Sequence, residues 1–268
     1  MDTLPSGIRF RHWPIDHAKA YVLLAHGLAE HTGRYERVVK KFNAQSIAVV
    51  GPDHVGHGLS PGCRGHVDRF REYLLPLSAL RRNIAVWHPG LPVFLLGHSL
   101  GGLIAAHLLL EDPSQYRGAL FSGPAFSSDE LPTTSFMLLA RLLRSIAPKL
   151  GVKTLDAKRI SRDPSVVEDY LTDPLVYSGR FSVSLIVEIL HAMELAIDRA
   201  NEIDVPIYIA HGASDTMASP QGSEAFYNRL GSQDKTLKIW PELFHEIFQE
   251  RQSEVVIDHF VEWVRAHV

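Results

Sequence analysis

The amino-acid sequence predicts an α/β fold: a mostly parallel central sheet with helices on both faces and a helical insertion. Two observations lead to this prediction. Short apolar runs alternate with longer segments of helical character, as in a doubly wound sheet. Between about residues 125 and 195 the alternation stops, and the apolar segments there favour helix.

Six short apolar runs are expected to form the sheet. Most are continuously apolar, which is typical of parallel strands covered on both faces. In chain order they are 20–27, 46–53, 92–99, 116–124, 205–212 and 235–240.

The expected helices between these strands are 34–45, 68–87 (interrupted by Pro76), 99–111, 219–230 and 251–267. The best delimited is 219–230, with Ser219 as N-cap, Pro220 in the first turn and Gly231 just beyond its end.

The insertion divides the chain into a core of residues 1–124 and 196–268 and a helical cap of residues 125–195. No convincing strand is found in the cap, and 135–150 and 181–197 are apolar and helical. In 135–150 one stripe holds Phe136, Leu139, Leu143 and Ile146, while Leu138 and Leu142 lie off it. This apolar face is wider than one buried face requires. Either it is buried core, or it faces lipid or lines the site of an acyl chain.

Composition excludes some classes of protein. The chain has 268 residues, of which 46% are hydrophobic and 21% charged, as in ordinary globular proteins. The net charge of −3 is too close to zero to suggest a nucleic-acid partner. Cys63 is the single cysteine, so no intrachain disulfide can form, which fits a reducing compartment.

The N-terminal segment lacks the apolar core of a signal peptide. No run approaches the roughly 18 apolar residues that a membrane span needs. We therefore expect a cytoplasmic protein, either in solution or peripherally associated with membranes or lipid droplets. The oligomeric state does not follow from the sequence.

The segment LLGHSLGG (95–102) is the strongest indication of chemistry. It contains G-x-S-x-G between a predicted strand and a predicted helix, which is the context of a nucleophile elbow. The tight turn requires small residues at Gly97 and Gly101, lifts the Ser99 hydroxyl clear of the sheet, and aims the positive end of the helix at a developing oxyanion. Ser99 is therefore the predicted nucleophile.

A serine nucleophile needs a general base, and the base needs an orienting acid. Asp215 and His245 each follow a predicted strand, in the chain order Ser, acid, His that this motif favours. We expect His245 to take the Ser99 proton and Asp215 to orient the imidazole. Asp215 could instead cap a turn, and Asp204 is a weaker rival because it precedes its strand.

His245 also begins the segment HEIFQ, which resembles the zinc motif H-E-x-x-H. Gln249 stands where the second histidine belongs, and the surroundings of Pro241 indicate a loop rather than a long helix. A metal cluster among His26, His31, His54, His57 and His66 is the other metal alternative, but no carboxylate has a recognisable ligand spacing. We expect no metal and no cofactor.

An acyl-transfer site also needs two N–H donors for the oxyanion. The residue after the nucleophile, Leu100, supplies one, and the loop His26–Gly27–Leu28 suits the other through the N–H of Leu28. Glu30 and Arg34 follow in the same loop, and either face the polar end of a substrate or belong to an exposed helix N-terminus.

The Gly-rich loop 53–65 is not a phosphate loop, since it has neither G-K-[ST] nor G-x-G-x-x-G. Asp53, His57 and Ser60 are expected to form structural hydrogen bonds. Cys63 is not expected to be catalytic, because a complete serine constellation exists without it.

Six segments carry a family resemblance: HGLAEHTGRY, DHVGHGLS, PGLPVFLLGHSLGG, TDPLVY, SQDKTLKIW and FHEIF. In this order they resemble the monoglyceride lipases of the serine α/β-hydrolase superfamily, from about residue 20 to the end. The resemblance implies an α/β-hydrolase fold, cofactor-free hydrolysis of monoacylglycerols to fatty acid and glycerol, and peripheral contact with membranes through an apolar cap.

The resemblance also implies site residues. Ser99, Asp215 and His245 match the catalytic positions, and Leu28 and Leu100 match the oxyanion donors. Glu30, Arg34, His98 and Tyr170 match positions that surround the polar glycerol end in the family. Leu28 and Leu100 depart from the small residue and the Met that family members often carry there. The cap is matched least, so the acyl-length preference stays open.

We expect a serine hydrolase that cleaves monoacylglycerols through an acyl-enzyme. The alternative activity is a broader carboxylesterase or lysophospholipase, and the alternative class is a non-catalytic lipid-binding protein on the same fold.

Overall fold

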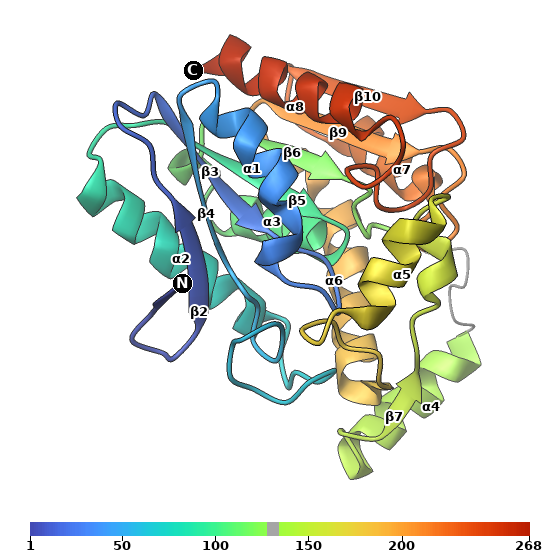
Figure 1. The fold of residues 1–268 in the computed structure, drawn as a ribbon. Helices are drawn as coiled ribbons and strands as arrows, with labels where there is room; N and C mark the ends of the chain where they lie inside the picture. Colours follow the sequence, from blue (N-terminus) through green and yellow to red (C-terminus); the bar gives the residue numbers. More distant parts are fainter. Residues whose placement is uncertain (128–133) are drawn as a thin grey trace.

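The computed structural model describes residues 1–127 and 134–268, and of residues 134–138 it describes only the backbone. Within these ranges an eight-stranded sheet runs through the molecule (Figure 1). Its strands in chain order are β1 (Asp2–Thr3), β2 (Arg9–Trp13), β3 (Ala20–Ala25), β4 (Ile47–Pro52), β5 (Val93–His98), β6 (Gly118–Ser122), β9 (Ile207–Gly212) and β10 (Lys235–Trp240). All six predicted strands are present in it.

The spatial order of the sheet is β1-β2-β4-β3-β5-β6-β9-β10. The pairs from β4 to β10 are parallel, whereas β2 pairs with β4 and β1 with β2 in antiparallel fashion. The mostly parallel sheet is therefore confirmed. The two N-terminal strands were not predicted, because Arg9–Trp13 alternates charged and aromatic residues and gains its strand character from pairing with β4.

Helices cover both faces of the sheet. The helices of the described ranges are α1 (Glu36–Asn43), α2 (Arg71–Trp87), α3 (Leu100–Glu111), α4 (Thr134–Ile146), α5 (Pro164–Thr172), α6 (Val183–Asp198), α7 (Pro220–Arg229) and α8 (Ser253–His267). Short 3-10 turns lie at Thr32–Tyr35, Pro113–Gln115, Ala157–Arg159 and Ala200–Glu202. Among these residues no helix has both the length and the apolarity that a bilayer crossing requires.

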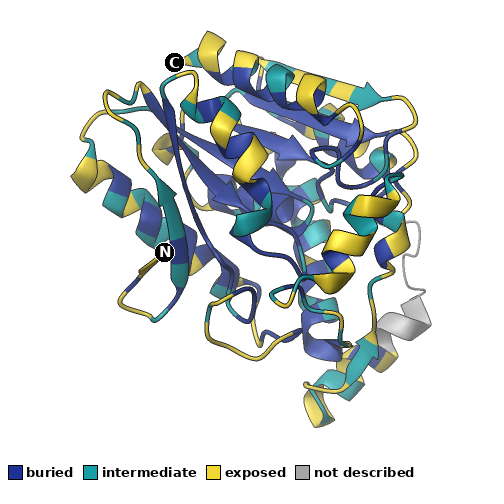
Figure 2. Cartoon of the chain, viewed as in Figure 1, coloured by how far each residue is buried: buried dark blue, intermediate teal, exposed yellow. Residues whose placement is uncertain are grey.

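Alternate residues of each central strand enter opposite cores. Leu23 belongs to the cluster that packs against α2, α3, α6 and α7, while its neighbour Leu24 belongs to the cluster beneath α1 and α8. This is the consequence of the two-residue period of a strand covered on both faces. Figure 2 shows the central strands buried and the outer faces of the helices exposed.

Two sequence predictions about elements need correction. The helix α2 is continuous through Pro76, which lies in its second turn and forgoes only the hydrogen bond to the preceding turn. The segment 125–195, in which no strand was predicted, contains β7 (Gly151–Lys153) and β8 (Phe181–Ser182), which pair with each other. Both are too short to produce a periodic pattern.

At α7, Ser219 does stand at the N-cap, as predicted. Its hydroxyl bonds to the side chain of Gln221 rather than to a helix N–H.

The segment between β6 and β9 lies at the side of the sheet to which the arrowheads of β6, β9 and β10 point (Figure 1). In α4, Ala140 is buried and Leu143 packs on the same small cluster, with Val183 and Val187 of α6. Leu139 and Ile146 of the predicted stripe are exposed, as is Leu142. The buried face of α4 is thus narrower than the stripe, and the side chains of Phe136 and Leu138 lie outside the described residues.

Candidate active site

The turn from β5 to α3 holds Ser99 in a strained conformation. Its φ is 52° and its ψ is −117°, a region that non-glycine residues rarely adopt. The flanking glycines allow the turn to close: a Cβ on Gly97 would lie 2.3 Å from the carbonyl oxygen of Gly101, and one on Gly101 would lie 1.9 Å from that of Ala25. Ser99 is half-buried between the buried His98 and Leu100.

The chain brings the other two predicted residues to Ser99 from the ends of neighbouring strands. His245 follows β10, and its Nε2 lies 2.8 Å from Ser99 Oγ. Asp215 follows β9, and its Oδ2 lies 2.7 Å from His245 Nδ1. The three side chains form one hydrogen-bonded chain, in which Nδ1–H donates to the carboxylate and Nε2 faces the hydroxyl. Asp204, at the opposite end of β9, takes no part in this chain.

The directions of the pKa shifts of Asp215 and His245 match this arrangement. Burial would raise the pKa of Asp215, but the neighbouring His245 and the hydrogen bonds from His211 and His245 outweigh it and lower that pKa. Burial would lower the pKa of His245, but the charge and hydrogen bond of Asp215 prevail and raise it. The ionised carboxylate therefore stabilises an imidazolium, which is the charge that forms when His245 accepts a proton.

The Asp215 carboxylate is itself held in place by groups that the sequence did not reveal. Its Oδ1 accepts from the N–H groups of Met217 at 2.8 Å and Ala218 at 3.1 Å. His211 Nε2 lies 3.0 Å from Oδ2, and His211 Nδ1 lies 2.7 Å from Ser223 Oγ. His211 is the penultimate residue of a continuously apolar strand, and only the register of β9 directs it toward the acid.

Leu100 and Leu28 are the predicted oxyanion donors. Leu100 begins α3, where N–H groups have no partner within the helix. Leu28 lies in the turn after β3 and follows Gly27, which is close to Ser99, because a Cβ on Gly27 would lie 3.4 Å from Ser99 Cβ. The following Ala29 has a φ of 72°, so this loop too is strained.

The carboxylate of Glu30 fixes the Leu28 loop. Its Oε1 accepts from Gly27 N at 2.5 Å and from Tyr35 Oη at 2.6 Å, and its Oε2 accepts from Arg34 Nη1 at 3.0 Å. Burial would raise the pKa of Glu30, but Arg34, His98 and these hydrogen bonds outweigh it and lower that pKa. Glu30 is buried and the side chain of Arg34 is only 10% exposed, so they do not belong to an exposed helix N-terminus.

Arg34 joins two loops of the site. Its guanidinium binds Glu246 through two hydrogen bonds, at 2.6 and 2.8 Å, and also binds Glu30. It lies 4.7 Å from the centre of the Tyr170 ring. Glu246 immediately follows His245 in the chain. The polar residues predicted around a glycerol end are therefore gathered together, with a small void of about 10 Å³ between Glu30, Arg34, His98 and Glu246.

His98 is buried beside the base, with ring centroids 4.9 Å apart. Its Nδ1 lies 2.8 Å from the carbonyl oxygen of Ser122. Burial first, and then the nearby His245, lower the pKa of His98 to about 4. His98 is therefore neutral at physiological pH and does not compete with His245 as a charged group.

Three other histidines of the early loops, His26, His54 and His57, form hydrogen bonds with the main chain. The rings of His26 and His54 lie tilted to each other with centroids 3.9 Å apart, and His26 Nε2 accepts from the N–H of His54 at 2.9 Å. Within residues 1–127 and 134–268 no group of three or more potential ligands is arranged to hold a metal ion. In the loop 53–65, Asp53 accepts from Thr32 and Leu59, and Ser60 donates to the carbonyl of Asp53. These are the structural roles expected of Asp53 and Ser60.

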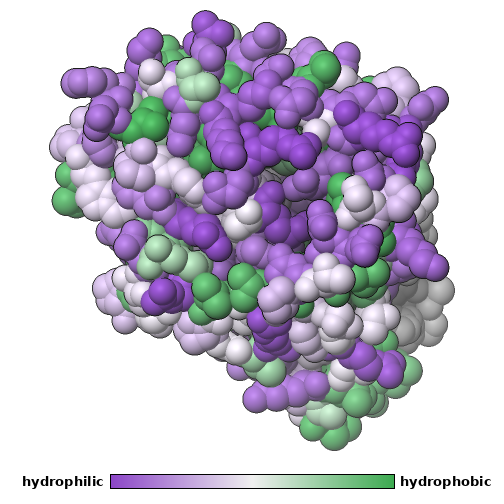
Figure 3. Space-filling view, viewed as in Figure 1, coloured by the Kyte–Doolittle hydropathy of each residue, from purple (hydrophilic) through white to green (hydrophobic). Residues whose placement is uncertain are grey.

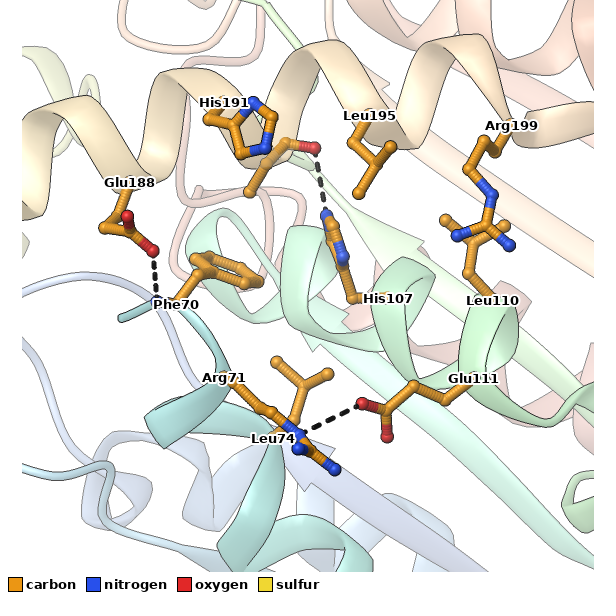
Figure 4. Close-up of a pocket in the computed structure, with 11 residues that line it drawn as sticks. Phe70, Arg71, Leu74, His107, Leu110, Glu111, Glu188, His191, Leu195 and Arg199 are labelled. Carbon is orange, nitrogen blue, oxygen red and sulfur yellow. Dashed lines mark hydrogen bonds and ion pairs between the residues drawn. The ribbon is translucent and has the colours of Figure 1, made fainter. Parts of the chain in front are cut away.

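A cavity of about 270 Å³ lies between α2, α3 and α6, and none of the three predicted catalytic residues lines it (Figure 4). Phe70, Leu74 and Leu195 form its apolar walls, and the ion pair of Arg71 and Glu111 lies at one side. The binding site of an acyl chain should open beside Ser99, so this cavity does not identify it.

The mostly parallel sheet with helices on both faces and the strained Ser99 turn between β5 and α3 are the features of an α/β-hydrolase. The family model described as "Serine aminopeptidase, S33" matches residues 16–252. The monoacylglycerol lipase of Mycolicibacterium smegmatis is 34% identical over 93% of this chain and 89% of its own length. The chain belongs to the monoglyceride lipase family of these hydrolases and is a carboxylic ester hydrolase.

Two solved structures support the same assignment. The monoacylglycerol lipase of Paleococcus ferrophilus is 32% identical, with a TM-score of 0.89 over 97% of this chain and 99% of its own. A soluble variant of the Saccharomyces cerevisiae monoglyceride lipase, in complex with a substrate analog, is 26% identical, with a TM-score of 0.85 over 97% of this chain and 91% of its own.

Proposed function

We propose that this hydrolase cleaves the ester bond of monoacylglycerols and releases a fatty acid and glycerol through an acyl-enzyme at Ser99. The observation that carries the proposal is the hydrogen-bonded chain from Ser99 through His245 to Asp215. The monoglyceride lipases among its relatives support the substrate class.

In the first step Ser99 Oγ attacks the ester carbonyl carbon while its proton passes to His245 Nε2. The carbonyl π electrons move to the oxygen, which the N–H groups of Leu28 and Leu100 stabilise. One such donor contributes about 3–4 kcal/mol where it has been measured. The bond to the glycerol oxygen then breaks, and glycerol leaves with the proton from His245.

In the second step the same groups act on water. His245 takes a proton from the water as it attacks the acyl carbon, and Ser99 leaves with that proton. Asp215 stays ionised throughout and stabilises the imidazolium in both steps. The scheme needs no cofactor, because His245 accepts a proton and gives it back in each of the two steps.

We assign the polar end of the substrate to the side of Ser99 where Glu30, Arg34, His98 and Tyr170 lie. The guanidinium of Arg34 already binds the carboxylates of both Glu30 and Glu246. A glycerol hydroxyl would therefore meet a fixed, hydrogen-bonded wall rather than free charges.

Residues 125–195 are proposed to act as the cap, with 1–124 and 196–268 as the hydrolase core. Apolar side chains of 135–150 and 181–197 would line the acyl chain. The exposed Leu139, Leu142, Ile146 and Leu150 lie on and beyond α4, and hydrophobic side chains gather at that end of the molecule (Figure 3). We propose that this surface attaches the protein peripherally to membranes or lipid droplets, which liposome co-sedimentation tests.

A substrate panel tests the assignment. Purified protein is given monoacylglycerols of several chain lengths, a diacylglycerol, a lysophospholipid and short soluble esters, and kcat/KM is compared. We expect the highest value for a monoacylglycerol. A higher value for short esters or for lysophospholipid would replace the substrate assignment with a broader esterase or lysophospholipase. Failure of wild type to react with a fluorophosphonate probe would favour a non-catalytic lipid-binding protein.

A further inference from the structure

The loop that carries His245 is closed by a buried carboxylate five residues further on. The side chain of Glu250 is fully buried. Its Oε1 accepts from the N–H of Phe244 at 3.1 Å. Phe244 is covalently bonded to His245, so this hydrogen bond fixes the main chain from which the imidazole projects.

The other partner of Glu250 comes from the segment between β6 and β9. Arg162 donates its main-chain N–H to Oε1 and its Nε–H to Oε2, both at 3.1 Å. A third contact runs beside them, from the N–H of Glu246 to the carbonyl oxygen of Ile160 at 2.8 Å. The residues on both sides of His245 are thus tied to Ile160–Arg162.

These contacts are strong enough to affect the geometry of the loop that carries His245. A buried carboxylate that loses its donors is destabilised far more than an exposed one, so Glu250 keeps the three N–H groups where they are. His245 must stay within hydrogen-bonding reach of both Ser99 and Asp215. A misplacement of about 1 Å in such a site can cost about a hundredfold in rate.

We propose that Glu250 and Arg162 are positioning residues for His245, through which the cap segment Ile160–Arg162 helps to hold the general base in place. This inference rests on the proposed function of His245. It makes the cap a part of the catalytic geometry, in addition to a cover for the acyl chain.

The experiment compares three variants with wild type on a monoacylglycerol and on p-nitrophenyl acetate, which has no glycerol. Glu250→Ala removes the acceptor, Glu250→Gln keeps an oxygen for Phe244 and Arg162, and Arg162→Met removes only the guanidinium. We expect kcat to fall about tenfold to a hundredfold in Glu250→Ala on both esters. Glu250→Gln should retain most of the wild-type kcat. Arg162→Met should lower kcat less than Glu250→Ala does.

The pH profile distinguishes positioning from general loss of stability. Asp215 raises the pKa of His245 against the effect of burial. If the imidazole moves away from Asp215, its pKa falls, so the acid limb of kcat/KM should shift to lower pH while the plateau decreases. Loss of folded protein would lower the plateau and leave the limb in place.

Glu188→Ala is the matched control. Glu188 accepts from one main-chain N–H, that of Phe70 at 2.6 Å, and from one arginine, Arg144 at 2.6 Å, but it does not contact the His245 loop. It should lower Tm and leave the acid limb unchanged.

Four results would overturn the proposal or its basis. Equal behaviour of Glu250→Ala and Glu188→Ala would make Glu250 merely structural. A loss confined to the monoacylglycerol would assign these residues to substrate binding instead. If Glu250→Ala does not fold, an unshifted limb in Arg162→Met contradicts the proposal. Inactive wild type on both esters would instead refute the proposed function.

Discussion

Helices α3 and α4 are both rich in leucine, yet the fold uses them in opposite ways. In α3 (Leu100–Glu111) the apolar residues are buried around almost the whole circumference, because the sheet lies on one side and α2 and α6 on others. In α4 (Thr134–Ile146), among residues 139–146, whose side chains the structure describes, only Ala140 is buried, and Leu142 and Ile146 are 58% and 75% exposed.

The difference shows that apolar composition does not by itself decide whether a helix is core. A helix that is apolar all round is buried when neighbours surround it, and otherwise presents an apolar surface. Here the buried helix begins at the nucleophile, and the exposed one belongs to the proposed cap. If this distinction is right, changes along α3 should affect chemistry and stability, while changes on the outer face of α4 should affect neither.

The largest expected effect is at the start of α3. Ser99→Ala removes the proposed nucleophile and should lower kcat/KM by a factor of about 10⁴ or more. The matched change in α4 is Ser145→Ala, whose exposed hydroxyl bonds only the carbonyl of Leu142. Its kcat/KM should stay within about twofold of wild type. Steady-state kinetics and fluorophosphonate labelling measure both, and a Ser99→Ala protein that still labels would refute the nucleophile assignment.

The second test compares two leucines by urea unfolding. Leu103 in α3 is fully buried, so Leu103→Ala should reduce the free energy of unfolding by about 2–5 kcal/mol. The exposed Leu142 leaves no cavity when truncated, so Leu142→Ala should change the free energy of unfolding by less than about 0.5 kcal/mol. Similar losses in the two variants would show that α4 is covered in solution.

The third test concerns titration beside α3. Burial lowers the pKa of His98 to about 4, whereas Asp215 raises that of His245. Since His245 must be neutral to act as a base, kcat/KM should fall as pH drops through its raised pKa, above the usual value of about 6.5. The loss of the carboxylate charge in Asp215→Asn should move this limb to lower pH and reduce the plateau. A limb that stays in place would show that another group controls it.

The smallest effect is expected from the outer face of α4. The variant Leu142→Ser/Ile146→Ser should reduce co-sedimentation with liposomes, because these side chains would supply apolar contact area. Its hydrolysis of a short soluble ester should be unchanged, which serves as the control for correct folding. Undiminished liposome binding would contradict the membrane role of α4.

Much of the site was predictable because its signals are local. Gly97, Ser99 and Gly101 lie within one turn, and the steric limits of that turn dictate their identity. Asp215 and His245 were predicted because parallel strands place the residues after their carboxyl ends at one edge of the sheet. His211, Glu246 and Glu250 were missed, because a polar residue in an apolar strand and two glutamates in a loop have no distinctive spacing.

The sequence by itself determined the alternation of strands and helices, the elbow at Ser99 and the chain order of serine, acid and histidine. These follow from periodicity and from backbone sterics, which act over a few residues. Only the tertiary structure decided that α4 is exposed on its outer side, that β1 and β2 extend the sheet, and that Glu30, Arg34 and Glu246 form one buried network. Burial and ion pairing depend on segments far apart in the chain, such as Arg34 and Glu246, which are 212 residues apart, and no local pattern encodes which distant group will be the partner.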